Sequence, residues 1–132
     1  MELALYIQIK AQDQIAFGFP LSAWLKEQFP DITLLDADNF SDDLVINQEL
    51  KMIKEALNCL LFIEVEPVAR PGKTVRLIEF ILRNKQTSTF IHLKGSNEVL
   101  EKMFSLGKAV FTQDLSEEDL KQDIIVWRAA QR

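Results

Sequence analysis

The regular alternation of short apolar runs with amphipathic segments is the feature that most constrains the fold of this chain. Five apolar runs are rich in Val, Ile, Leu, Phe or Thr, and they occupy residues 3–9, 32–37, 59–65, 89–93 and 109–113. The runs in the middle of the chain are almost continuously apolar, which is typical of strands that are covered on both faces. Strands that alternate strictly with helices favour right-handed crossovers, and these produce a parallel sheet with helices on both sides.

We therefore predict an α/β fold with three layers, α/β/α, built on a flavodoxin-like five-stranded parallel sheet. The expected strand order is 2-1-3-4-5, which follows from the architecture and not from any single residue. A chain of 132 residues is long enough for one hydrophobic core and too short for a second domain. No repeat, linker or low-complexity tract interrupts the alternation, so residues 1–132 are interpreted as a single domain.

Helical periodicity between the runs predicts five helices, which begin near Pro20, Ser41, Lys73, Asn97 and Ser116. The buried stripes expected on the second and fourth helices consist of Ile46, Leu50, Ile53 and Leu57, and of Val99, Leu100, Met103 and Phe104. The last helix is expected to bury Leu120, Ile124 and Trp127. Each helix thus has one apolar stripe that can pack against the sheet.

Composition and charge argue against several classes of partner. The formal net charge is −5 and the basic residues are scattered, so neither nucleic acid nor an anionic membrane is expected. No apolar run approaches the roughly 20 residues that cross a bilayer. The single cysteine, Cys59, cannot form an internal disulfide, so a cytoplasmic location is expected. No His, Cys and carboxylate cluster has the spacing of a metal site, and neither a metal nor another cofactor is expected.

The predicted topology also indicates where a ligand would bind. In such sheets, ligands lie beyond the carboxyl ends of the strands, where successive connections leave in opposite directions. Here that point lies between the first and third strands, which makes the long loops 10–19 and 64–74 the candidate ligand loops. The polar side chains predicted to bind the ligand are Lys10, Gln12, Asp13, Glu66, Lys73 and Thr74. A nucleoside, a nucleotide or a small anion is the expected ligand.

The tripeptide Gly72-Lys73-Thr74 matches only the end of a phosphate-binding loop. The first glycine of that pattern would be residue 67, which is a proline here. A phosphate cradle works through consecutive backbone N–H groups, and neither Pro67 nor Pro71 has one. We interpret the segment as a proline-stiffened loop that opens a helix. The first turn of this helix could still bind one anion.

Glu79 is a candidate catalytic carboxylate in the middle of the third predicted helix. It lies at the edge of the apolar stripe, with Arg76 and Arg83 at helical spacing. One interpretation is a surface ladder of ion pairs, each worth a few tenths of a kcal/mol. The other interpretation is a nucleophile or charge stabiliser at the rim of the ligand cleft.

The five β-α units, with a carboxylate in the helix after the third strand, resemble the nucleoside 2-deoxyribosyltransferase-like superfamily and the related TIR domains. The similar stretch is CLLFIEVEPVARPGKTVRLIEFILRNKQTSTFIHL, residues 59–93. In those families a glutamate on this helix attacks or stabilises the anomeric carbon of an N-glycosidic bond. The resemblance implies this role for Glu79, with Gly72 and Thr74 corresponding loosely to the family's Gly-Thr.

Two further features are ambiguous in the sequence. His92 lies in an apolar strand, where a packed histidine is more common than a catalytic one. Phe17, Phe19 and Trp24 surround the first loop, and they could line a stacking pocket or pack in the core.

Two functional hypotheses remain open. The first is a non-catalytic or divergent nucleotide- or ligand-binding module, or a protein-interaction module that contacts a partner or a second copy through an exposed helix or sheet edge. The second is a hydrolase or transferase that acts on the N-glycosidic bond of a nucleoside or nucleotide. In the second hypothesis Glu79 is the nucleophile and the loop with Lys10, Gln12 and Asp13 faces it.

Overall fold

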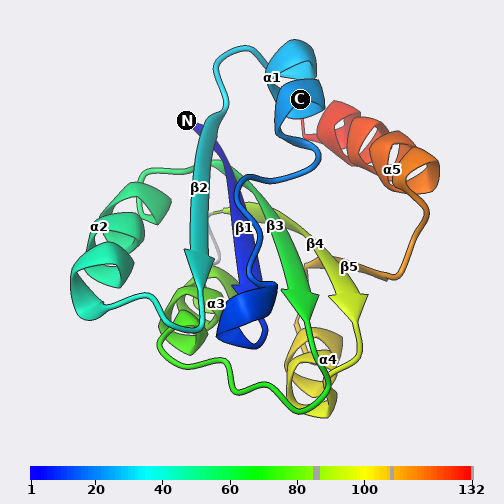
Figure 1. The fold of residues 1–132 in the computed structure, drawn as a ribbon. Coiled ribbons are helices and arrows are strands. Elements are labelled where there is room, and N and C mark those ends of the chain that lie inside the picture. Colours follow the sequence, from blue (N-terminus) through cyan, green and yellow to red (C-terminus); the bar gives the residue numbers. More distant parts are fainter. Residues whose placement is uncertain (85–86, 108, 132) are drawn as a thin grey trace.

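The computed structural model describes residues 1–84, 87–107 and 109–131. One parallel sheet with the strand order β2-β1-β3-β4-β5 forms the centre of the molecule, as predicted (Figure 1). The strands are β1 (Glu2–Ile9), β2 (Thr33–Asp38), β3 (Asn58–Val65), β4 (Ser88–Gly95) and β5 (Val110–Gln113). Each predicted apolar run therefore forms a strand.

Helices cover both faces of the sheet and complete the three-layer flavodoxin-like arrangement (Figure 1). The helices are α1 (Ser22–Gln28), α2 (Asp43–Ile53), α3 (Thr74–Arg83), α4 (Glu98–Ser105) and α5 (Glu117–Ala130), with a short 3₁₀ turn η1 (Gln12–Gln14) after β1. Helices α1 and α5 share one face, and α2, α3 and α4 share the other. Every helix in the described part of the chain is too short or too polar to span a bilayer.

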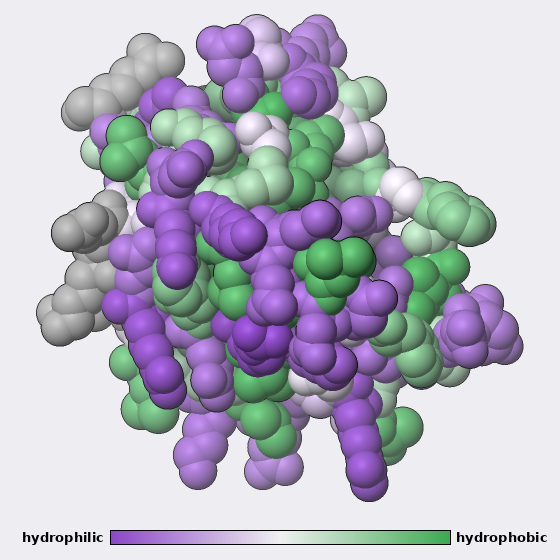
Figure 2. Space-filling model, turned by 90° about the vertical axis from the view of Figure 1, so that its left-hand side faces the viewer, coloured by the Kyte–Doolittle hydropathy of each residue, from purple (hydrophilic) through white to green (hydrophobic). Residues whose placement is uncertain are grey.

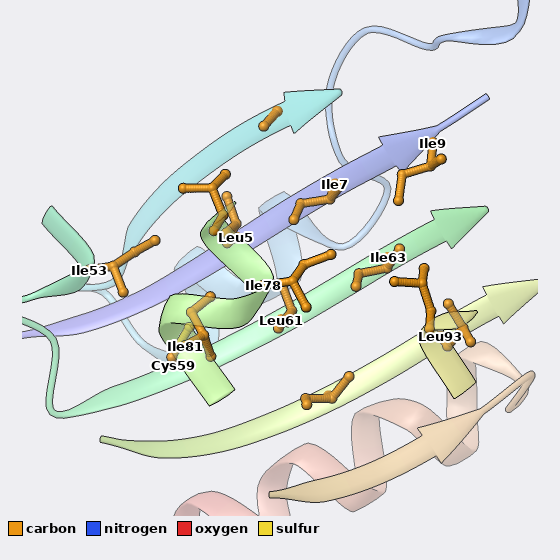
Figure 3. Close-up of a cluster of buried hydrophobic side chains, with 14 of the residues drawn as sticks. Leu5, Ile7, Ile9, Ile53, Cys59, Leu61, Ile63, Ile78, Ile81 and Leu93 are labelled. Carbon is orange, nitrogen blue, oxygen red and sulfur yellow. The ribbon is translucent and has the colours of Figure 1, made fainter. Parts of the chain in front are cut away.

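Alternation along the strands gives each face of the sheet its own apolar core. Odd-numbered strand residues such as Leu5, Ile7 and Leu61 pack with Ile78 of α3, as the close-up in Figure 3 shows. Even-numbered residues pack against α1 and α5, and these include Ala4, Tyr6, Leu60, Phe62 and Phe90. The central strands are therefore buried on both sides, which explains their nearly continuous apolarity.

Short polar side chains cap three of the helices, as their positions in the sequence suggest. The side chains of Asp42, Asn97 and Ser116 accept hydrogen bonds from backbone amides in the first turns of α2, α4 and α5. Each cap pairs a backbone amide that the helix leaves without an intrahelical partner.

Two residues of the predicted apolar stripes are exposed. Leu57 is 65% exposed because α2 ends at Ile53, so this residue follows the helix in a turn instead of continuing its stripe. Val99 is 62% exposed because the buried face of α4 is centred on Leu100 and Phe104. Adjacent helical residues differ by about 100° in direction, so Val99 faces solvent when Leu100 faces the sheet.

The side of the molecule formed by α2 is mostly hydrophilic, with small separate hydrophobic groups (Figure 2). Exposed apolar side chains on this side include Phe40 and Leu44. Small apolar groups of this kind are normal on a protein surface.

Candidate functional site

The face of the sheet that packs against α1 and α5 changes from apolar to polar towards the carboxyl ends of the strands. Near the amino ends this face carries Ala4, Leu60 and Phe90, which are buried. Three residues before the ends of their strands, Tyr6, Phe62 and His92 lie side by side in register. The next row is Gln8, Glu64 and Lys94. A row of polar side chains therefore crosses the point between β1 and β3 where the connections diverge.

A pocket of about 230 Å³ lies against this polar row. Its aromatic wall consists of Phe19, Tyr6 and Phe62, and the rings of Phe19 and Tyr6 stack with their centroids 4.5 Å apart. Leucines from the start of α1 and α5 add to the apolar surface. The polar residues that line the pocket are Glu64, His92, Lys94, Asp114 and Glu117.

Glu64 is the most highly connected carboxylate of the pocket. Its Oε2 accepts a hydrogen bond from the Tyr6 hydroxyl at 2.6 Å and one from Lys10 Nζ at 2.6 Å. Lys94 Nζ lies 3.7 Å from Oε1, so Oε1 keeps room to accept from a ligand. Partial burial by itself raises the pKa of Glu64, but the hydrogen bonds from Lys10 and Tyr6 and the two lysine charges outweigh burial and lower it.

Tyr6 and Lys10 hold this carboxylate in a fixed orientation. Burial first, and then the hydrogen bond to Glu64, raises the pKa of Tyr6, so its hydroxyl remains a donor at neutral pH. Lys10 also donates to Gln8 Oε1 at 3.3 Å. Glu64 is thus an ionised acceptor whose position is fixed by Tyr6 on β1 and by Lys10 directly after this strand.

Gln8 connects the strand to the loop that carries Phe19. Its buried side-chain amide donates to the carbonyl of Ala16 at 2.8 Å and accepts from the amide of Ala16 at 2.9 Å. Because both polar atoms of the side chain are paired, the loop is fixed three residues before Phe19. The aromatic wall therefore depends on one buried glutamine.

Gly95 and Asp114 shape the rim on the other side of the pocket. Gly95 has a φ of +104°, and a Cβ there would overlap the carbonyl oxygen of Val65. Its amide donates to Asp114 Oδ1 at 2.8 Å. Asp114 itself has a φ of +51°, a conformation that aspartate adopts more readily than most residues. The loop between β5 and α5 is therefore tied to the end of β4.

Lys10 is the residue of the predicted site that joins this arrangement. Gln12 and Asp13 lie in η1 and are exposed. Glu66 follows β3 and accepts from the Ala11 amide at 3.4 Å, which links the two predicted loops. These residues are near the same edge of the sheet, but the pocket is lined by earlier strand residues, Tyr6 on β1 and residues 62–64 on β3.

The Gly72-Lys73-Thr74 segment opens α3, as the sequence indicated. Thr74 is fully buried and its hydroxyl donates to the carbonyl of Pro71 at 2.6 Å, while Lys73 pairs with Asp43 at 3.1 Å. Gly72 has a φ of +60°, and a Cβ there would lie 2.5 Å from the carbonyl oxygen of Asn39. The glycine is therefore required by close contact between two loops.

Glu79 lies on α3, in the layer opposite the pocket. Its side chain is 45% exposed and approaches Arg83 at 3.9 Å. Arg76 pairs with Asp43 and Asn47 of α2 instead of with Glu79. The expected ladder is therefore divided between two helices, and the structure does not bring Glu79 together with Lys10.

Several pocket residues were missed by the sequence analysis. Glu64 is the one polar residue of the run 59–65 and begins the candidate loop 64–74, but it was not predicted to bind the ligand. Tyr6 lies in a run that was interpreted as core, and Lys94 directly follows another such run. One signal in the sequence could have identified them. Polar residues occur at alternate positions near the carboxyl ends of three strands, which places them on the same face of the sheet. Phe19, one of the aromatic residues noted around the first loop, does line the pocket.

Comparisons with protein-family models, curated protein sequences and solved structures found no match for this chain. Within residues 1–84, 87–107 and 109–131, no group of three or more His, Cys, Asp or Glu side chains could hold a metal ion. The fold and the pocket together define a flavodoxin-like α/β domain with a small aromatic and polar pocket at the carboxyl edge of its sheet.

Proposed function

We propose that this chain is a ligand-binding module that takes up a small, uncharged, partly aromatic molecule in the pocket beside Glu64. The observation that carries the proposal is the coincidence of an aromatic wall with a row of oriented polar groups at the switch point of the sheet. Pockets that combine apolar walls with a few convergent polar groups are the usual form of small-molecule sites.

The size of the pocket limits the ligand. A volume of about 230 Å³ is below the roughly 300–1,000 Å³ of sites that bind drug-sized molecules. A single heteroaromatic base or a molecule of similar size fits this volume better than a dinucleotide does.

The charges around the pocket are balanced. Glu64 is paired with Lys10, and Glu117 is paired with Lys121 at 3.0 Å. The remaining two charged side chains that line the pocket, Lys94 and Asp114, have opposite signs. A ligand that carries net charge would leave one charge uncompensated, so among the expected ligands a nucleoside is favoured over a nucleotide or a small anion.

The alternative function, cleavage of an N-glycosidic bond with Glu79 as nucleophile, would require a separate cleft on the α3 side. Glu79 is not among the residues that line the pocket. Base release by the protein and by Glu79→Gln tests this alternative directly. A loss of base release in Glu79→Gln would favour catalysis over simple binding.

The binding proposal is tested by NMR titration of backbone amides with the four ribonucleosides and with benzamide. We expect shifts at Gly95, Asp114 and Leu115 and little change on α2 and α3. Phe19→Ala should reduce binding several-fold because it removes part of the aromatic wall. Phe40→Ala is the matched control, since Phe40 is exposed and does not line this pocket. Equal binding by both variants, or no shift at the pocket with any probe, would refute the proposal.

A further inference from the structure

His92 is the pocket residue whose chemistry the sequence left open. It is the one histidine of the chain, the residue is 6% exposed, and it lines the pocket between Phe62 and Lys94. Its neighbour in the register is Thr112 of β5. The two side chains are in hydrogen-bonding contact, with Nδ1 and Oγ1 2.9 Å apart.

The surroundings of Thr112 determine which partner donates in this contact. Its Oγ1 lies 3.2 Å from the carbonyl oxygen of Ile91, and a carbonyl oxygen can only accept. The single hydroxyl proton is therefore used on Ile91, and Oγ1 offers a lone pair to the imidazole. His92 must then carry its proton on Nδ1 to complete the contact.

This assignment leaves Nε2 as a bare acceptor. Within the described residues Nε2 has no hydrogen-bond partner. The atom is also not fully buried, so it is open to the pocket that His92 lines. Burial is the main cause that lowers the pKa of His92, which keeps the ring neutral at physiological pH.

From this geometry, and on the basis of the proposed ligand-binding function, we infer that His92 is a specificity-determining residue that selects ligands with an N–H or O–H donor. Nε2 accepts from the ligand, and Glu64 Oε1 is a second acceptor on the neighbouring strand. Thr112 is a positioning residue, because it acts on the ligand only through the tautomer of His92. A ligand of the same shape without a donor would leave a polar nitrogen desolvated and unpaired.

The tautomer can be measured without a ligand. Protein made without a histidine tag and labelled with ¹⁵N in its histidine gives the signals of one imidazole, whose protonated and bare nitrogens differ widely in chemical shift. We expect a neutral ring protonated at Nδ1. Thr112→Ser keeps the hydroxyl and should keep this tautomer, whereas Thr112→Val should shift the ring towards protonation at Nε2. A wild-type ring protonated at Nε2 would overturn the inference.

Selectivity is tested with benzamide and acetophenone, which have the same shape and differ by an NH₂ in place of a CH₃. We expect benzamide to bind about 3- to 10-fold more tightly, the range that one hydrogen bond supports. Thr112→Val should reduce this ratio and Thr112→Ser should preserve it. Equal affinities at the pocket would refute donor selection and leave the ligand-binding proposal standing. If no probe binds at the pocket, the ligand-binding proposal itself falls, and donor selection falls with it.

Discussion

Glu49 on α2 gives the most direct test of how burial controls stability in this domain. The residue is 7% exposed, and within the described residues its Oε1 has no hydrogen-bond partner. It lies on the buried face of α2 with Ile46 and Ile53. Burial, and secondarily the charge of Asp36, raises the pKa of Glu49 to about 8. The folded state therefore keeps this carboxyl protonated at neutral pH, while the unfolded state ionises it.

The direction of the pH dependence follows from this difference. Because the pKa is raised in the folded state, the folded state binds more protons between pH 4.5 and about pH 8. The stability contribution of neutral Glu49 is complete below pH 4.5 and is lost as the pH rises towards 8. The full difference in pKa between the folded and unfolded states corresponds to roughly 5 kcal/mol of unfolding free energy. Structural relaxation and entry of water reduce the expected loss of stability to roughly 2–4 kcal/mol.

Urea unfolding of wild type and Glu49→Gln between pH 5 and pH 9 measures this loss. Glutamine has nearly the same shape and cannot ionise. We therefore expect the unfolding free energy of the variant, relative to that of wild type, to rise by roughly 2–4 kcal/mol between pH 5 and pH 9. Glu55→Gln is the control, because Glu55 is an exposed carboxylate just beyond α2. Parallel pH profiles for wild type and Glu49→Gln would show that the carboxyl is solvated in both states, and the reasoning would be refuted.

Two further substitutions test the geometry of the pocket. Gly95→Ala should lower the free energy of unfolding in urea by roughly 2–4 kcal/mol, because the new Cβ would overlap the carbonyl oxygen of Val65. Gly18 also has a positive φ but has open space around it, so Gly18→Ala is the control and should cost about 1 kcal/mol. Equal losses in the two variants would contradict the overlap. Tyr6→Phe should raise the pKa of Glu64 towards its ordinary value, because it removes the hydrogen bond from the hydroxyl. The stability that ionised Glu64 contributes should fall by about 1 kcal/mol. This contribution is present above the unfolded-state pKa and is lost as the pH falls through the folded-state pKa. An unchanged Glu64 titration in ¹³C NMR would contradict this role of the hydroxyl.

The fold could be predicted because periodicity is a local signal. A run such as residues 59–65 has enough apolar residues to identify a strand covered on both faces, and it forms β3 over Asn58–Val65. Leu57 and Val99 were placed wrongly because an apolar residue near a helix end matches the helical spacing even when the helix stops or faces elsewhere. The sequence does not show where a turn redirects the chain.

The pocket could be predicted only in part, because its residues come together through the register of neighbouring strands. Lys10 was found because it begins a long loop at the switch point. Glu64 begins the other candidate loop, 64–74, but it was not predicted to bind the ligand, because a single polar residue in an apolar run gives no sign of its partner. Its position beside Gln8 and Lys94 becomes visible only when the three strands are aligned.

Polar residues of the central strands gather on one face of the sheet because the helices cover the two faces differently. On the face covered by α2, α3 and α4, odd-numbered residues remain apolar to the ends of the central strands, where Ile9, Val65 and Leu93 are buried. On the other face, α1 has only seven residues, and it lies with the end of α5 towards the amino ends of the strands (Figure 1). Even-numbered residues near the carboxyl ends thus lack a full helical cover. Polar side chains and the loop with Phe19 replace this cover, so the short α1 helix is the structural reason for a pocket at this position.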